Sequence, residues 1–123
     1  MSDQRKFGVW MDNHHATVVG KTNPEGKEYS VIAHVTGEGT PDNSSEKNLH
    51  NHENALMVKF FKEISSHMLN PQVVHVTGTG QAQEQFIHWL ADTPQYKNVK
   101  ATECTSNKMS DERLVEFLGE KLN

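Results

Sequence analysis

The sequence predicts an α/β domain in which a three-stranded antiparallel meander continues into a mixed five-stranded sheet with helices packed on it. Two observations favour this class: apolar residues alternate in the opening third of the chain, and strand-like and helix-like runs alternate after it. The predicted order of elements is β-β-β-α-β-α-β-α. Such an order is typical of a sheet that is antiparallel at one side and parallel at the other.

The opening third predicts three strands. The first two, residues 6–11 and 16–20, flank a turn at Asp12 and Asn13 and indicate a hairpin. The third, residues 29–36, follows another turn. Alternation along the first strand places three apolar residues on one face: Phe7, Val9 and Met11. Alternation along the third strand places four residues on one side: Tyr29, Val31, Ala33 and Val35.

The segment from Gly37 to His52 is polar and rich in turn-forming residues, and it predicts one long loop over residues 37–52. Long loops without regular structure in compact domains are usually functional or disordered. This loop is therefore the first place in which to expect a binding surface.

The rest of the chain alternates between helices and strands. A helix over residues 53–69 carries an apolar stripe that is typical of a core-facing helix, namely Leu56, Met57, Phe60, Phe61, Ile64 and Met68. A strand over 72–77 is rich in β-branched residues, which indicates burial on both faces. A helix over 81–91, a strand over 99–104 and a final helix capped by Ser110 follow. The final helix has an apolar ridge of Leu114, Leu118 and Leu122.

Length and composition place the 123 residues in one domain, 1–123, with a core that needs no disulfide. The single cysteine, Cys104, has no partner for an internal bridge, and a reduced, cytoplasmic setting is expected. No apolar run reaches the roughly 20 residues of a membrane span, so no membrane partner is expected. The net charge of −4 argues against nucleic-acid binding by bulk charge, although a localised contact is compatible with it.

A histidine cluster is the candidate metal site. His50, His52 and Glu53 lie close together in the sequence and offer ligands that zinc accepts, but a third protein ligand must come from a distant residue such as His14 or His15. The spacing does not supply that ligand, and a solvated histidine cluster in a loop is the favoured interpretation. The sequence therefore predicts no cofactor, with zinc as the alternative.

The run Gly78-Thr79-Gly80-Gln81 lies between a predicted strand and a predicted helix. Free N–H groups at a helix start can bind an anion, but phosphate-binding fingerprints require a third glycine or a Gly-Lys-Ser/Thr sequence. Gly78, Gly80 and Gln81 are thus candidate binding residues, and a tight turn that packs the helix against the sheet is the favoured interpretation.

No catalytic group is predicted. Asp12 fits a hairpin turn better than a metal-dependent nuclease, because nothing in the sequence brings further carboxylates to it. Cys104 has no identifiable base beside it in the sequence and is expected to be a small core residue.

Three stretches resemble the middle domain of the class-1 peptide release factors of archaea and eukaryotes and of their relative pelota, and look closest to small stand-alone bacterial proteins of that type. The stretches are 7–19, 73–86 and 103–118, which include Phe7-Gly-Val-Trp-Met-Asp, Val73-Val-His-Val-Thr-Gly-Thr-Gly-Gln and Lys108-Met-Ser-Asp-Glu-Arg. The resemblance implies the mixed sheet described above and a role in translation.

The loop that carries the Gly-Gly-Gln tip in release factors corresponds to residues 37–52, and it contains no such tripeptide. Gln81 lies in a different loop, so peptide release is not expected. Pelota-type domains also lack the tripeptide and act by binding in the ribosome. The resemblance therefore implies a noncatalytic domain that contacts the ribosome, tRNA or other RNA. The alternatives are a histidine-based metal-binding protein or metal-dependent hydrolase, and a protein-interaction domain that forms homo-oligomers.

Overall fold

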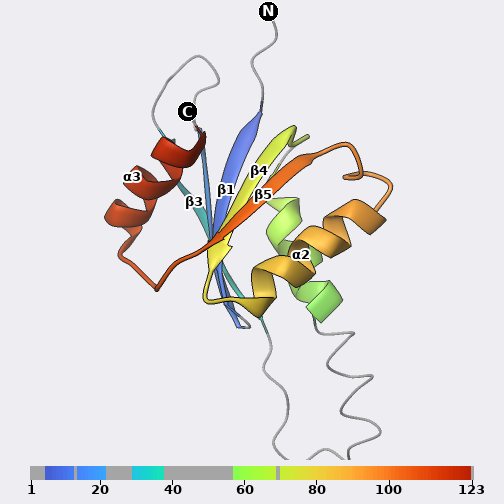
Figure 1. Cartoon of the computed structure of the whole chain (residues 1–123), viewed down its shortest axis with the longest axis horizontal. Helices are drawn as coiled ribbons and strands as arrows, with labels where there is room; N and C mark the ends of the chain where they lie inside the picture. Colours follow the sequence, from blue (N-terminus) through green and yellow to red (C-terminus); the bar gives the residue numbers. More distant parts are fainter. Residues whose placement is uncertain (1–4, 13, 22–28, 38–56, 69, 123) are drawn as a thin grey trace, which may run out of the picture.

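Five strands form one open sheet in the order β3-β2-β1-β4-β5 (Figure 1). The computed structural model describes residues 5–12, 14–21, 29–37, 57–68 and 70–122. The strands are β1 (Lys6–Met11), β2 (His15–Lys21), β3 (Tyr29–Thr36), β4 (Val73–Gly78) and β5 (Lys100–Thr105). Strands β1, β2 and β3 pair antiparallel, whereas β1, β4 and β5 pair in parallel. The predicted fold class is confirmed.

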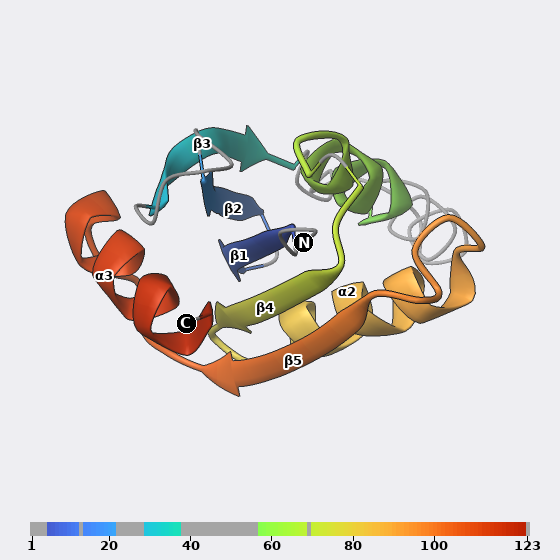
Figure 2. The same cartoon turned by 90° about the horizontal axis from the view of Figure 1, so that it is seen from above.

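Three helices cover the sheet in the described part of the chain. A helix at 57–66, drawn in green, and α2 (Gln81–Asp92) lie on one face, and α3 (Asp111–Leu122) lies on the other (Figure 2). None of these helices is long and apolar enough to cross a membrane.

The first helix ends earlier than the sequence predicts. Its described residues are helical to residue 66, while residues 53–56 and 69 of the predicted helix lie outside the described residues. The hydroxyl groups of Ser65 and Ser66 donate to the carbonyl oxygens of Lys62 and Glu63, at 2.9 and 2.6 Å. Such back-bonding competes with regular helical hydrogen bonds. Asn70 then adopts a φ of 51°, a left-handed conformation that leads the chain away from the helix.

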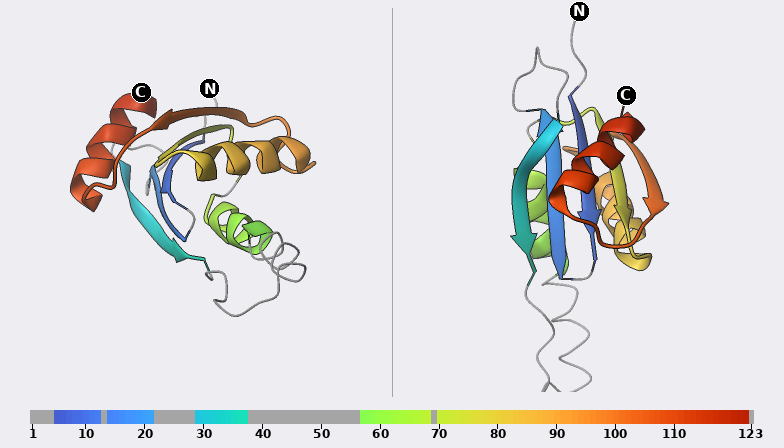
Figure 3. Two further views of the ribbon diagram at one scale, coloured as in Figure 1. Left: turned by 60° about the horizontal axis from the view of Figure 1, so that its bottom comes forward. Right: turned by 90° about the vertical axis from the view of Figure 1, so that its left-hand side faces the viewer.

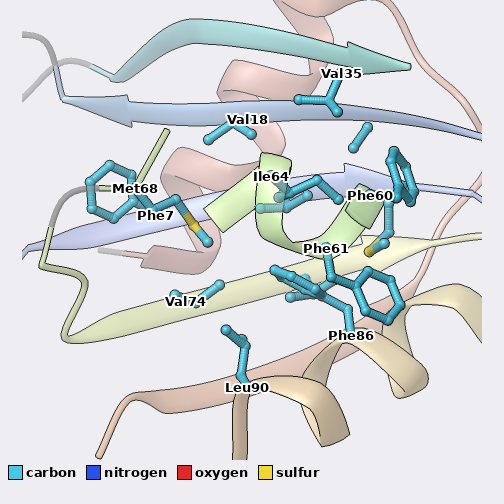
Figure 4. Close-up of a cluster of buried hydrophobic side chains, with 14 of the residues drawn as sticks. Phe7, Val18, Val35, Phe60, Phe61, Ile64, Met68, Val74, Phe86 and Leu90 are labelled. Atoms are coloured by element: carbon cyan, nitrogen blue, oxygen red, sulfur yellow. The ribbon is translucent and has the colours of Figure 1, made fainter. Parts of the chain in front are cut away.

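The larger core lies between the sheet and the first two helices (Figure 4). The predicted faces of β1 and of the first helix both point into it. Strand β4 adds Val74 and Val76, and α2 adds Phe86 and Leu90. Phe86 stacks on Trp89 with ring centroids 6.0 Å apart and contacts Phe61 at 5.3 Å. This aromatic group joins the two helices across the core.

A second core lies on the opposite face of the sheet, beneath α3. The predicted leucine ridge of α3, Leu114, Leu118 and Leu122, is buried there against Trp10, Val19 and Tyr29. Figure 3 shows α3 lying on this face while the other helices lie on the far side of the sheet. Alternate residues of β1 therefore enter different cores, as the period of two in a strand requires.

The prediction that Tyr29, Val31, Ala33 and Val35 all lie on one face of β3 is wrong. The register of β3 against β2 shifts between Val18, which pairs with Ala33, and Val19, which pairs with Val31. Ile32 is thus an extra residue at a β-bulge, and one extra residue reverses the alternation. As a result, Tyr29 and Val31 pack in the core beneath α3, whereas Ala33 and Val35 pack in the larger core.

Replacement of Phe86 by alanine is expected to lower the free energy of unfolding by about 3–5 kcal/mol, because the side chain is fully buried and its ring contacts hold two helices together. Urea denaturation measures the change. The neighbouring Gln85→Ala is the control, since Gln85 is exposed and its truncation is expected to stay within about 0.5 kcal/mol. Equal effects of the two substitutions would contradict this account of the core.

Candidate functional site

The strand directions bring several polar connections to one edge of the sheet. Strands β1, β3, β4 and β5 all end at this edge and β2 begins there, on the lower side of Figure 1. We call it the carboxyl edge and define it by residues 12, 14–15, 34, 36–37, 78–80 and 106–110. In open α/β sheets, ligands bind at the carboxyl ends of the parallel strands. The predicted loop 37–52 also starts here, at Gly37, while its residues 38–52 lie outside the described residues.

Asp12 organises the connection between β1 and β2. Its Oδ1 accepts hydrogen bonds from the backbone N–H groups of His14 and His15, at 2.8 and 2.6 Å. The backbone N–H of Gly37 donates to the carbonyl oxygen of His14 at 2.6 Å, which ties the end of β3 to the same turn. The predicted role of Asp12 in a hairpin turn is thereby confirmed.

The electrostatic surroundings of Asp12 favour its ionised form. Burial of the carboxyl group acts to raise its pKa, but the hydrogen bonds from His14 and His15 and the charges of these histidines outweigh it. The net result is a pKa lowered from 3.8. His15 Nδ1 lies 3.6 Å from Asp12 Oδ1, while the His15 side chain is 56% exposed and available for other contacts.

A cavity of about 220 Å³ opens at this edge between α3 and strands β2 and β3. The apolar side chains beside it are those of Trp10, Met109 and Leu114, which belong to the core beneath α3. Ala16 and Val35 also line it, although their side chains pack in the larger core on the other face of the sheet. Its polar residues are His15, Thr17, His34, Thr36, Lys108 and Asp111. His34 Nε2 lies 2.9 Å from Asp111 Oδ2, which links β3 to the first turn of α3. Ser110 Oγ accepts from the N–H of Arg113 at 3.3 Å, as expected of the predicted cap.

The local backbone structure explains both glycines of the Gly78–Gly80 turn. A Cβ at Gly78 would lie 2.0 Å from the carbonyl oxygen of Met11, so β4 can approach β1 only with glycine there. Gly80 has a φ of 149°, which side chains rarely adopt. Gln83 accepts from the Gly80 N–H at 3.0 Å and donates to the carbonyl oxygens of Gly78 and Cys104. These contacts account for a tight turn, and anion binding by Gly78, Gly80 or Gln81 stays a prediction.

A polar group on β4 and β5 was not predicted. His75 Nε2 lies 3.2 Å from Cys104 Sγ, and His75 Nδ1 lies 2.7 Å from Thr102 Oγ1. The Cys104 thiol also donates to Thr77 Oγ1 at 3.2 Å. Cys104 is partly exposed rather than a core residue, and it does have an imidazole beside it. The strand register brings them together, because His75 pairs with Thr102 and Thr77 with Cys104.

A thiol within hydrogen-bond reach of an imidazole is one half of a nucleophilic cysteine site. Here both residues lie on the strands, and neither lines the described cavity. Burial lowers the pKa of His75 from 6.5, and the positive charge of Lys121 lowers it further. His75 is therefore held neutral, which satisfies its two ring contacts without a buried charge.

The predicted metal ligands divide into two groups. His50, His52 and Glu53 lie outside the described residues. His14 and His15 lie exposed at the carboxyl edge. Among the residues that the structure describes, no group of three or more histidines, cysteines or acidic residues is placed to hold a metal ion. His34 and Lys108 were not predicted as site residues. The sequence signal for them was that His34 lies near the end of β3 and Lys108 shortly before the start of α3, at the same edge of the sheet.

The comparisons with known proteins find similarity in fold. No model of a known protein family matches the chain, and no curated protein sequence does. Among solved structures, archaeal translation termination factor aRF1 matches with a TM-score of 0.58 and 14% identity over 98% of this chain. The Pelota protein of Thermoplasma acidophilum matches with a TM-score of 0.61 and 18% identity over 97%, and Archaeoglobus fulgidus Pelota with 0.58 and 13% over 98%.

The chain spans about a third of the length of these proteins: 35% of the termination factor and 34% and 33% of the two Pelota proteins. The fold is therefore that of one part of each, and the resemblance to release factors and pelota is confirmed at the level of the fold.

Asp12→Ala is expected to lower the free energy of unfolding at neutral pH by on the order of 1 kcal/mol, because two backbone N–H groups lose their acceptor. The pKa of Asp12 is lower in the folded state, so its contribution is complete above the unfolded pKa of 3.8 and is lost as the pH falls through the folded value. Urea denaturation from pH 7 to below pH 3 should show the two stability curves converging in acid. A constant difference between them would contradict an ionised acceptor.

Lys121→Gln is expected to raise the pKa of His75 toward 6.5 but not to it, because the effect of burial remains. Proton NMR titration of the His75 ring measures this directly. Since the folded-state pKa is depressed, His75 reduces stability as the pH falls below about 6.5, where the unfolded chain binds a proton that the folded chain does not. Lys97→Gln, at an exposed position absent from the His75 surroundings, is the control. An unchanged titration in Lys121→Gln would show that Lys121 has no influence.

Proposed function

We propose that this chain is a noncatalytic binding domain of the translation machinery that contacts RNA of the ribosome through its carboxyl edge. The observation that carries the proposal is the likeness to a translation termination factor over 98% of the chain. Folds host unrelated functions, so the argument must also rest on the edge itself.

The chemistry of the carboxyl edge supports an RNA contact. Its exposed residues include His14, His15, His34 and Lys108, all of which can donate hydrogen bonds to phosphate oxygens. The net charge of −4 means that such a contact depends on a local set of donors rather than on the charge of the whole surface. The absence of Gly-Gly-Gln from residues 37–52 favours binding without peptide release.

Co-sedimentation of the purified protein with ribosomes on sucrose gradients is the test. The protein is expected to comigrate at low salt, and less so at physiological salt, because phosphate contacts release counterions. Lys108→Glu is expected to weaken the association and to reduce its salt dependence by roughly one phosphate contact.

Lys100→Glu is the matched control, since it makes the same change of charge at an exposed residue where β5 begins, at the opposite edge of the sheet. Protein that stays at the top of the gradient at both salt concentrations would overturn the proposal. Equal losses in the two variants would place the contact elsewhere.

A further inference from the structure

We propose that the cavity beside α3 binds a single unstacked nucleobase, with the adjoining phosphate held by Lys108 and His15. The inference rests on the proposed function for its choice of RNA as the source of the base. It is carried by three observations: the mixed lining of the cavity, the tryptophan among its lining residues, and the two exposed basic side chains among its polar residues.

The size and lining of the cavity fit one aromatic ring system. Its volume of about 220 Å³ corresponds to roughly seven water molecules at about 30 Å³ each, which is small for a drug-like ligand and adequate for a base alone. Trp10, Met109 and Leu114 would contact the faces of the base. Single-stranded RNA is recognised in this way, by placing unstacked bases against apolar or aromatic groups and bonding their edges.

Trp10 is the unusual member of the wall. Its side chain is 3% exposed and lines the cavity, and its Nε1–H has no hydrogen-bond partner among the described residues. The Nε1 atom itself is buried, so a base in the cavity meets the indole ring and not its N–H group. Aromatic side chains are among the groups against which unstacked bases are placed.

The polar residues of the cavity can read the edge of a base. Bases present donors and acceptors side by side, and the His34–Asp111 pair offers both, from side chains 60% and 54% exposed. The same Asp111 carboxylate disfavours a free anion as the sole ligand. A nucleotide avoids this conflict, because its base can meet Asp111 while its phosphate meets Lys108 and His15.

The indole N–H resonance of Trp10 in an NMR spectrum of the ¹⁵N-labelled protein is the readout, assigned with Trp89→Phe, which leaves Trp10 as the single tryptophan. The probes are the four ribonucleoside monophosphates, adenosine and inorganic phosphate, each titrated alone. Saturable shifts are expected with at least one monophosphate, with weaker binding of adenosine and the weakest of phosphate.

Two variants locate the site. Lys108→Glu is expected to weaken nucleotide binding about tenfold, the equivalent of one lost charge-assisted hydrogen bond, while Lys100→Glu leaves it unchanged. Thr36→Trp places a large side chain at an exposed position of the lining and should abolish binding. Dispersion of the remaining amide resonances verifies that each variant is folded.

Three outcomes would overturn the inference: no saturable shift with any nucleotide, phosphate binding as tightly as nucleotides, or unchanged binding in Thr36→Trp. Ribosome co-sedimentation of the same proteins separates this inference from the proposed function. Nucleotide binding without ribosome association would refute the function and support the cavity site. Ribosome association without nucleotide binding would refute the cavity site and leave the function standing.

Discussion

The arrangement depends on β1, which is paired antiparallel on one side and parallel on the other while its side chains alternate between two cores. Glycines permit close approach to β1 from α3 on one face and from β4 at one side. A Cβ at Gly8 would meet Leu118 of α3 at 2.8 Å, and a Cβ at Gly78 would meet the Met11 carbonyl oxygen at 2.0 Å. The position of α3, the β1–β4 pairing and both cores therefore follow from the packing around one strand.

The pairing of β1 with its neighbours also determines which connections and polar residues lie close together. Because the antiparallel hairpins return β3 to the direction of β1, the ends of β1, β3, β4 and β5 meet at one edge. Asp12, Gly78 and Ser110 each stabilise a connection there, through an acceptor, a close approach and a cap. Three basic residues lie exposed between these connections: His15 contacts Asp12, His34 contacts Asp111, and Lys108 lines the same cavity.

The elements could be predicted from the sequence because apolar spacing reports local burial: the leucines of α3 and the alternation of β1 needed no tertiary information. The bulge at Ile32 could not, since an extra residue shows only when β3 is placed against β2. The contact between the His75 and Cys104 side chains depends likewise on the register of two strands separated in the sequence by α2. The cavity combines residues from β1, β2, β3, α3 and the connection before α3, and no local pattern identifies such a set.

The number of histidines in the sequence does not show which of them are buried and which are exposed. Protonation of all eight would change the formal charge from −4 to +4, yet the described ones lie in different environments. His75 is buried and kept neutral by burial and by Lys121, so it adds no charge to the surface near neutrality. His14, His15 and His34 are exposed at the carboxyl edge. His67 and His88 are exposed as well, after the first helix and on α2, so the exposed histidines of the described residues are divided between the carboxyl edge and the helices on the far face of the sheet.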